Sequence, residues 1–156
     1  LHMILKRGEP PEREYFEREV KPLLASDVEL YENVTHAEKI ELLGRASAMA
    51  FPIRWPEPFG LVMIEAMACG TPVIAFTGGS VEEIVCDGVS GWICRDAADM
   101  AAKAQAPGIP SESCRAWVAA HFSRERMVER YLDLYERARS GSEPSVGVET
   151  TASWKT

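Results

Sequence analysis

The segment from Glu57 to Gly70 constrains the fold more than any other part of the chain. It reads EPFGLVMIEAMACG, and its second half is a run of apolar, helix-forming residues that a glycine ends. This pattern predicts a buried helix over 61–69, entered from a loop that contains proline and glycine. The apolar segment that follows, 72–75, is typical of a buried strand. A buried helix that leads directly into a buried strand is characteristic of α/β folds.

Two carboxylates belong to this segment. Glu65 lies inside the apolar run, where an unpaired charge is costly to bury, so we expect it to have a partner. Glu57 lies eight residues earlier, in the loop. The N–H groups of Phe59, Gly60 and Leu61 at the helix entrance have no partner within the helix and can bind anionic or hydroxyl oxygens. A carboxylate can accept two hydrogen bonds from a vicinal diol such as ribose, so the pattern suits a nucleotide sugar. An alternative in which Glu65 caps or salt-bridges a neighbouring loop, and Glu57 is only a solvated loop residue, explains the spacing equally well.

The rest of the chain alternates between strand and helix patterns. Strands are predicted at 3–5, 28–31, 48–51, 72–75 and 91–94, and helices at 12–24, 36–46, 61–69, 81–85, 97–104, 111–120 and 124–139. We expect an α/β fold with a Rossmann-like, doubly wound parallel sheet, forming one domain over 3–139. The strand at 48–51 is apolar throughout, which predicts burial on both faces. Residues 140–156 lack periodicity and are rich in Gly, Ser and Thr, so a disordered tail is predicted.

A second loop, 77–80, follows the strand at 72–75 and leads into the next short helix. Ligands of open α/β sheets bind at the carboxyl ends of the strands, so this loop and the loop at 53–60 are expected to face one crevice. Gly78 and Gly79 permit positive φ and close backbone approach. An ordinary turn is the alternative interpretation of these glycines.

Four sequence segments together resemble the signature of a known enzyme family: EPFG at 57–60, EAMACGTPVIA at 65–75, GGSVEEIV at 78–85 and DGVSGWI at 87–93. The chain resembles the C-terminal, donor-binding domain of the group 1 retaining nucleotide-sugar glycosyltransferases, which have the GT-B fold. With the flanking helices, the resemblance covers roughly 3–139. It implies a domain that binds a nucleotide-diphosphate sugar as donor substrate, with no further cofactor and no metal.

The resemblance also implies roles for individual residues. Glu57 is the candidate catalytic residue and would contact hydroxyls of the transferred sugar. Glu65 would accept the ribose hydroxyls of the donor. The implied donor-binding set is Glu65, Phe59, Gly60, Leu61, Gly78 and Gly79. Cleavage of the sugar–phosphate bond places negative charge on the leaving diphosphate, so preorganised hydrogen-bond donors matter most, and no dedicated enzymic base is needed.

In this family an arginine and a lysine that bind the diphosphate precede the point at which this chain begins. We therefore expect the chain alone to be inactive, and its partner to be an N-terminal acceptor domain that the chain lacks. Lys6 and Arg7 are candidates to supply substitute charge, with a solvated loop pair as the alternative. Arg54 lies three residues before Glu57, and pairing with that carboxylate or with a phosphate is equally well supported.

Composition limits the remaining possibilities. The net charge of −7 argues against a nucleic-acid partner, since the basic residues are scattered. The four cysteines lack C-x-x-C spacing, which indicates reduced thiols in a cytoplasmic protein rather than a metal site. No apolar run approaches the ~20 residues of a spanning helix, and peripheral membrane association of the parent enzyme stays open.

The terminal helices carry aromatic residues that need a packing partner. We expect Trp117, His121 and Tyr131 to pack on the sheet or on a missing domain, leaving a partly exposed apolar patch that a homodimer could cover. A second class of function stays open, a catalytically silent Rossmann-like binding or assembly module. The presence of Glu57 and Glu65 favours the enzyme, and the absence of the basic pair favours the silent module.

Overall fold

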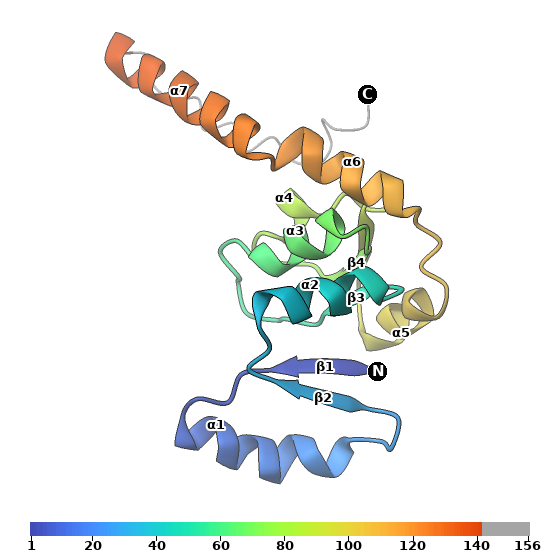
Figure 1. The fold of residues 1–156 in the computed structure, drawn as a ribbon. Coiled ribbons are helices and arrows are strands. Elements are labelled where there is room, and N and C mark those ends of the chain that lie inside the picture. Colours follow the sequence, from blue (N-terminus) through green and yellow to red (C-terminus); the bar gives the residue numbers. More distant parts are fainter. Residues whose placement is uncertain (142–156) are drawn as a thin grey trace. The chain divides into compact units, whose positions relative to one another are not determined.

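The computed structural model describes residues 1–141, and the predicted disordered tail lies outside the described residues from position 142 onward. Figure 1 shows the helices and strands. The described residues form two compact units, one over Leu1–Lys39 and one that begins at Ile40. Each unit is described by itself below.

The first unit contains a parallel pair of strands and a helical segment between them. In chain order its elements are β1 (His2–Leu5), α1 (Pro10–Tyr15), the π-helical turn η1 (Phe16–Val20), the 3-10 turn η2 (Lys21–Leu23) and β2 (Glu29–Glu32). The helical segment predicted from residue 12 begins two residues earlier, at Pro10. Proline fits the first turn of a helix, because the N–H group that it lacks would have no partner there.

A capping box begins the next helix, α2 (His36–Arg45). The Glu38 carboxylate accepts hydrogen bonds from the N–H and the hydroxyl of Thr35, each 2.7 Å long. The Glu38 N–H donates to Thr35 Oγ1 at 3.3 Å. The hydrogen bonds from Thr35 also hold the pKa of Glu38 below its usual range. The predicted capping box of Thr35 and Glu38 at the start of this helix is therefore confirmed.

The second unit has three parallel strands with helices between them. Its elements after α2 are β3 (Met49–Phe51), α3 (Leu61–Ala68), β4 (Val73–Phe76), α4 (Val81–Ile84), β5 (Gly91–Cys94), α5 (Ala97–Gln105), α6 (Ser111–His121) and α7 (Arg124–Ser140). The sheet order is β3-β4-β5, so β4 is the central strand. This alternation of parallel strands and helices confirms the predicted α/β class. The strands form two separate parallel sheets, one in each unit.

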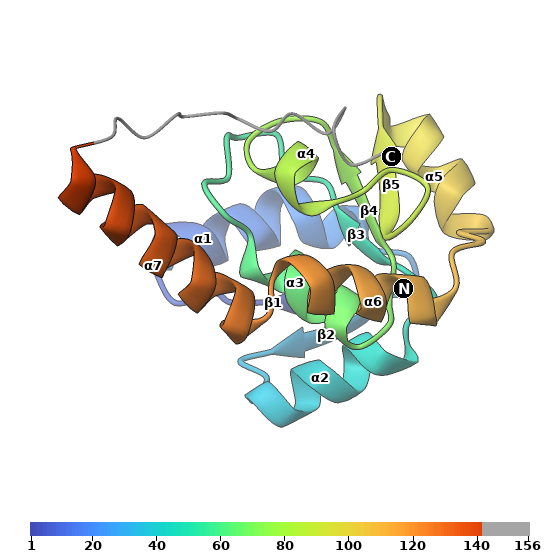
Figure 2. The same ribbon diagram turned by 90° about the horizontal axis from the view of Figure 1, so that it is seen from above.

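The two faces of the central strand β4 build two apolar clusters. Val73 and Ala75 face the larger cluster, which includes Met63 and Met67 of α3. The alternate residue Ile74 faces a smaller cluster with Met100 of α5. This alternation follows from the two-residue period of a strand. On the larger side α6 packs against α3, and the two helices can be followed in Figure 2.

Burial of the strand predicted at 48–51 differs from the expectation. Phe51 is buried, but Ala50 is exposed. The reason lies in the cover of the sheet, because α5 packs over β4 and β5 and leaves the Ala50 face of β3 open in the described structure. The prediction that this strand is covered on both faces is therefore wrong.

The expected apolar patch is present and lies on α7. None of its residues is buried, and Figure 1 shows the helix extending away from the sheet of its unit. The large exposed apolar side chains of α7 are Met127, Val128, Tyr131, Leu132, Leu134 and Tyr135. Trp117 and His121 behave differently, since their rings stack 3.8 Å apart and Trp117 Nε1 donates to the Ile84 carbonyl at 2.9 Å. Of the three predicted aromatics, only Tyr131 belongs to the patch.

Two methionines make a matched test of this core. Met67 is fully buried, whereas Met127 is 52% exposed on α7. Met67→Ala should lower the free energy of unfolding by about 2–5 kcal/mol, because it removes buried methylenes and leaves a cavity. Met127→Ala should change it by less than about 0.5 kcal/mol. Urea unfolding followed by circular dichroism measures both, and equal losses would contradict this description of the core.

Candidate functional site

The loop between β3 and α3 enters the helix through a glycine that no other residue can replace without strain. Gly60 has φ +75°, and an added Cβ would lie 2.5 Å from Met63 Cε. The Gly60 N–H donates to Glu57 Oε1 at 3.1 Å. Glu57 therefore places its carboxylate at the N-terminus of α3, where negative charge is favoured.

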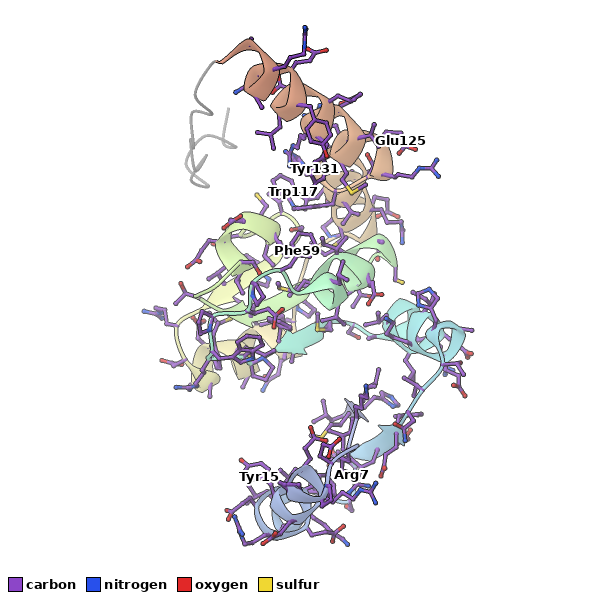
Figure 3. The ribbon with its side chains drawn as sticks, turned by 90° about the vertical axis from the view of Figure 1, so that its left-hand side faces the viewer. Arg7, Tyr15, Phe59, Trp117, Glu125 and Tyr131 are labelled. Carbon is purple, nitrogen blue, oxygen red and sulfur yellow. The ribbon has the colours of Figure 1, made fainter. Side chains whose placement is uncertain are left out.

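This contact corrects one expectation about the helix entrance. The N–H group of Gly60 is not free, because Glu57 already accepts its hydrogen bond. The N–H groups of Phe59 and Leu61 make no hydrogen bond to a residue that the structure describes. Both side chains are exposed, and Figure 3 shows Phe59 on this loop. The entrance thus offers two of the three predicted backbone donors.

Two hydrogen bonds from Ser80 tie the loop at 77–80 to the Glu57 loop. The Ser80 N–H donates to the Glu57 carbonyl at 3.0 Å, and Ser80 Oγ donates to the Phe59 carbonyl at 2.8 Å. Ser80 is 95% buried, as its exposed fraction of 5% shows. The structure therefore brings together the two loops that the sequence singles out.

The second glycine of this loop allows the close approach. Gly79 has φ +58°, and an added Cβ would lie 2.6 Å from both the N and the O atoms of Glu57. Because those neighbours are backbone atoms, they cannot move aside as the end of a flexible side chain can. Gly78 also has positive φ, +126°, but an added Cβ there would meet nothing within 4 Å. The alternative of an ordinary turn thus fits Gly78 better than Gly79.

Further contacts fix the first half of the Glu57 loop. The Glu57 N–H donates to the Trp55 carbonyl at 2.8 Å, which closes a tight turn around Pro56. The guanidinium of Arg54 lies over the Phe76 ring, 4.9 Å from its centroid. No ion pair joins Arg54 to Glu57 in the part of the chain that the structure describes. The interpretation in which these two side chains pair is therefore wrong, and Arg54 stacks on the end of β4 instead.

Glu65 lies at mid-helix in α3 and is half-buried. Glu65 interacts with another group of the chain. Its spacing of four residues puts it on the same helix face as Leu61, whose side chain is 65% exposed, whereas Met63 and Met67 are fully buried. Burial, with the charge of Glu65 as a second cause, raises the pKa of the nearby Cys69 thiol. Glu65 therefore lies on the more exposed face of α3, below the helix entrance.

Arg7, a residue of the first unit, already has carboxylate partners. Its guanidinium pairs with Glu32, approaches Glu17 at 3.7 Å and lies over the Phe16 ring at 4.1 Å. Only 19% of the side chain is exposed, so the description of Lys6 and Arg7 as a solvated pair is wrong for Arg7. Lys6 is exposed, as expected. Figure 3 shows Arg7 in its unit.

Within residues 1–141, no group of three or more His, Cys, Asp and Glu side chains is arranged to hold a metal ion. None of the four cysteines, all of which lie in the described part of the chain, forms a disulfide. Burial raises the pKa of the Cys94 and Cys114 thiols. Over the same residues, no helix has the length and apolar character that crossing a membrane requires.

The parallel α/β sheet, with two joined loops at the carboxyl ends of β3 and β4, defines a Rossmann-like domain. Residues 7–107 match the family model described as "Glycosyl transferases group 1". The chain belongs to this family. Its sequence is 40% identical over 108 residues to a D-inositol 3-phosphate glycosyltransferase of Geodermatophilus obscurus, an alignment that covers 66% of this chain and 24% of that protein. It is 43% identical over 72 residues to a glycogen synthase of Mycobacterium tuberculosis, an alignment that covers 45% of this chain and 17% of that protein.

Solved structures agree with the family. AviGT4, a glycosyltransferase involved in avilamycin A biosynthesis, matches with a TM-score of 0.70 and 28% identity over 90% of this chain and 43% of that chain. A sucrose-phosphate synthase from Thermosynechococcus elongatus matches with a TM-score of 0.69 and 29% identity, over 89% of this chain and 39% of that chain. The fold is therefore that of the C-terminal part of a GT-B glycosyltransferase. The chain spans less than half of the length of each of these four relatives.

Sequence reasoning missed the contribution of Ser80. A serine immediately before a helix is usually read as its N-cap. In the structure the Ser80 side chain makes no capping bond to α4 and donates to Phe59 instead. The only available signal was its place directly after two glycines, which is compatible with many loops.

A pair of glycine substitutions tests the contact between the loops. Gly79→Ala should destabilise the domain by about 1–3 kcal/mol more than Gly78→Ala. Both residues have positive φ, but only a Cβ at Gly79 collides with the Glu57 backbone. Thermal and urea unfolding of the two variants measure the difference, and equal destabilisation would contradict the close approach.

Proposed function

We propose that this chain is the donor-binding domain of a retaining glycosyltransferase, which moves a sugar from a nucleotide-diphosphate sugar to an acceptor hydroxyl. The observation that best supports this proposal is Glu57, which is held at the entrance of α3 by Gly60 and by the Ser80 loop. This arrangement lies inside the segment that matches the glycosyltransferase family. An ordered carboxylate beside unpaired backbone donors suits a ligand that carries both hydroxyl groups and negative charge.

Each residue has a defined role in this proposal. Glu65 accepts hydrogen bonds from the two ribose hydroxyls, and Glu57 accepts from hydroxyls of the transferred sugar. The N–H groups of Phe59 and Leu61 donate to the sugar and the diphosphate. The backbone of Gly78 and Gly79 lines the same ligand. The donor is a substrate, and the proposal requires no separate cofactor.

The chemistry follows from the charge that develops during transfer. As the bond between the sugar and the diphosphate breaks, the sugar gains positive character and the diphosphate gains negative charge. Preorganised N–H donors at the helix entrance stabilise the second of these charges. A retaining transfer of this type needs no enzymic base, because the departing phosphate can take the proton of the incoming hydroxyl. The chain therefore supplies binding and orientation in this proposal.

The positive charge for the diphosphate has several candidates. Arg54 is exposed, and the described structure gives it no ion-pair partner. Lys6 is also exposed, whereas Arg7 would have to leave its carboxylate partners Glu17 and Glu32. The engagement of Arg7 is the observation that favours the alternative function, a catalytically silent Rossmann-like module. Nucleotide binding separates the two functions.

The proposed partner is an N-terminal acceptor domain, without which we expect the chain to be inactive. The relatives named above are larger than the matched segment, which supports this partner. These relatives include an inositol phosphate glycosyltransferase, a glycogen synthase and a sucrose-phosphate synthase, so we propose that the acceptor is a polyol or sugar hydroxyl. We also propose a cytoplasmic location. A homodimer that covers the α7 patch is a second proposed assembly, which sedimentation of the chain tests.

Calorimetric titration of the chain with UDP, GDP and ADP tests the donor site. At least one nucleotide should bind, and Glu65→Ala should weaken that binding by about tenfold or more, because it removes a charged acceptor of two hydrogen bonds. Glu125→Ala is the matched control, since Glu125 is exposed on α7, as Figure 3 shows.

The possible results have distinct meanings. Nucleotide binding that is lost in Glu65→Ala but kept in Glu125→Ala supports the donor site. The nucleotide that binds most tightly identifies the nucleobase of the donor. If the folded chain binds none of the nucleotides, the upstream segment of a full-length relative should be fused to its N-terminus and the titration repeated. Binding that is still absent would favour the silent module. Equal losses in both variants would show that the effect is general electrostatics.

A further inference from the structure

Trp55 is an exposed aromatic residue on a backbone that several contacts hold in place. Its side chain is 58% exposed, although removing an indole from water is strongly favourable. The residues on both sides are anchored. Arg54 stacks on Phe76, and the Glu57 N–H donates to the Trp55 carbonyl at 2.8 Å across Pro56. A large apolar ring on an ordered segment loses little conformational entropy when it binds a ligand.

Comparison with two other tryptophans shows that this exposure is particular to Trp55. Trp92 is half-buried and donates from Nε1 to the Pro107 carbonyl at 2.7 Å. Trp117 is half-buried and donates to the Ile84 carbonyl at 2.9 Å. The indole N–H of Trp55 makes no hydrogen bond to any residue within 1–141. Both its ring face and its polar N–H are therefore available to a ligand.

The carboxylate two residues away supplies the second half of a recognition site. Glu57 Oε1 accepts from Gly60, and Oε2 makes no hydrogen bond to a described residue. Gly79 packs directly against the backbone of Pro56 and Glu57, and Ser80 donates to the Glu57 carbonyl. The backbone that joins the indole to the carboxylate is thus fixed, and the two groups lie on one short turn.

This combination fits the chemistry of a sugar ring. A pyranose presents C–H groups on a face, which stack on an aromatic ring, and hydroxyl groups on its edge, which donate to a carboxylate. We propose that Trp55 is a binding residue for the transferred sugar, with its indole against the ring face while Glu57 accepts from the hydroxyls. This inference rests on the proposed function, because it assigns the sugar part of the same donor to a particular side chain.

The competing ligand for an exposed indole is a nucleobase, which also stacks on aromatic rings. The carboxylate favours the sugar, since the proposed position of Glu65, one helical turn into α3, already assigns the nucleoside to a different part of the site. A sugar contact and a base contact give different responses to free nucleotides. That difference decides between them.

The test uses the whole chain labelled with 15N, with NMR detection of the Trp55 indole N–H. The probes are methyl α-glycosides of glucose, galactose and mannose, then UDP, GDP and ADP, then the corresponding nucleotide sugars. The Trp55 signal should shift with at least one glycoside or nucleotide sugar and not with the free nucleotides. Trp55→Ala should weaken sugar-dependent binding by about three- to tenfold and leave nucleotide affinity unchanged, with Trp55→Phe losing less. Tyr135→Ala, an exposed aromatic substitution on α7, is the control and should change neither.

The results separate this inference from the proposed function. Shifts with glycosides in a chain that binds no nucleotide would support the sugar contact and overturn the nucleotide donor. Nucleotide binding that depends on Glu65, together with a Trp55 signal that no sugar probe moves, would overturn the sugar contact alone. A Trp55 signal that moves equally with free nucleotides would assign the indole to the base and also overturn the inference.

Discussion

The contact between the loops at 53–60 and 77–80 is the interaction on which the candidate site depends. Ser80 supplies two hydrogen bonds to this contact, and Gly79 allows the backbones to meet. Each loop follows a different strand of one parallel sheet, so the sheet sets their separation and the loops complete the approach. The carboxylate of Glu57 gains its position from this contact and from the Gly60 N–H.

Much of the fold was predictable because local signals and burial agree. The apolar run at 61–69 had one stable location, between the sheet and another helix, and α3 is found there. The capping box at Thr35 and Glu38 is a purely local motif, and it formed as predicted. The exposure of Ala50 was not predictable, because the pattern of an apolar strand does not tell which helix covers each of its faces. Which helix covers a strand depends on tertiary packing, and here α5 lies over the neighbouring strands β4 and β5.

The site shows the same division between local and tertiary information. The motif and its resemblance to a family identified the loops and the glutamates. The partners of the charged side chains depended on contacts between segments far apart in the sequence. Arg7, which follows β1, pairs with Glu32, which is distant in sequence and ends the neighbouring strand β2. Arg54 stacks on Phe76 rather than pairing with the nearby Glu57. Spacing along the chain shows which groups are available, but the packing selects the contacts that form.

The state of the helix entrance has a consequence for ligand binding. The N-terminus of α3 is partly neutralised by its own loop, because Glu57 accepts from Gly60. An anionic diphosphate that approached the same amides would meet this carboxylate, and the repulsion would favour a position nearer Phe59 and Leu61. A neutral sugar has the opposite preference, since its hydroxyls donate to the carboxylate and its ring can lie against an exposed aromatic face. In the proposed donor complex, the entrance therefore separates the two parts of the nucleotide sugar by charge, with the sugar beside Glu57 and the phosphates toward the remaining N–H groups.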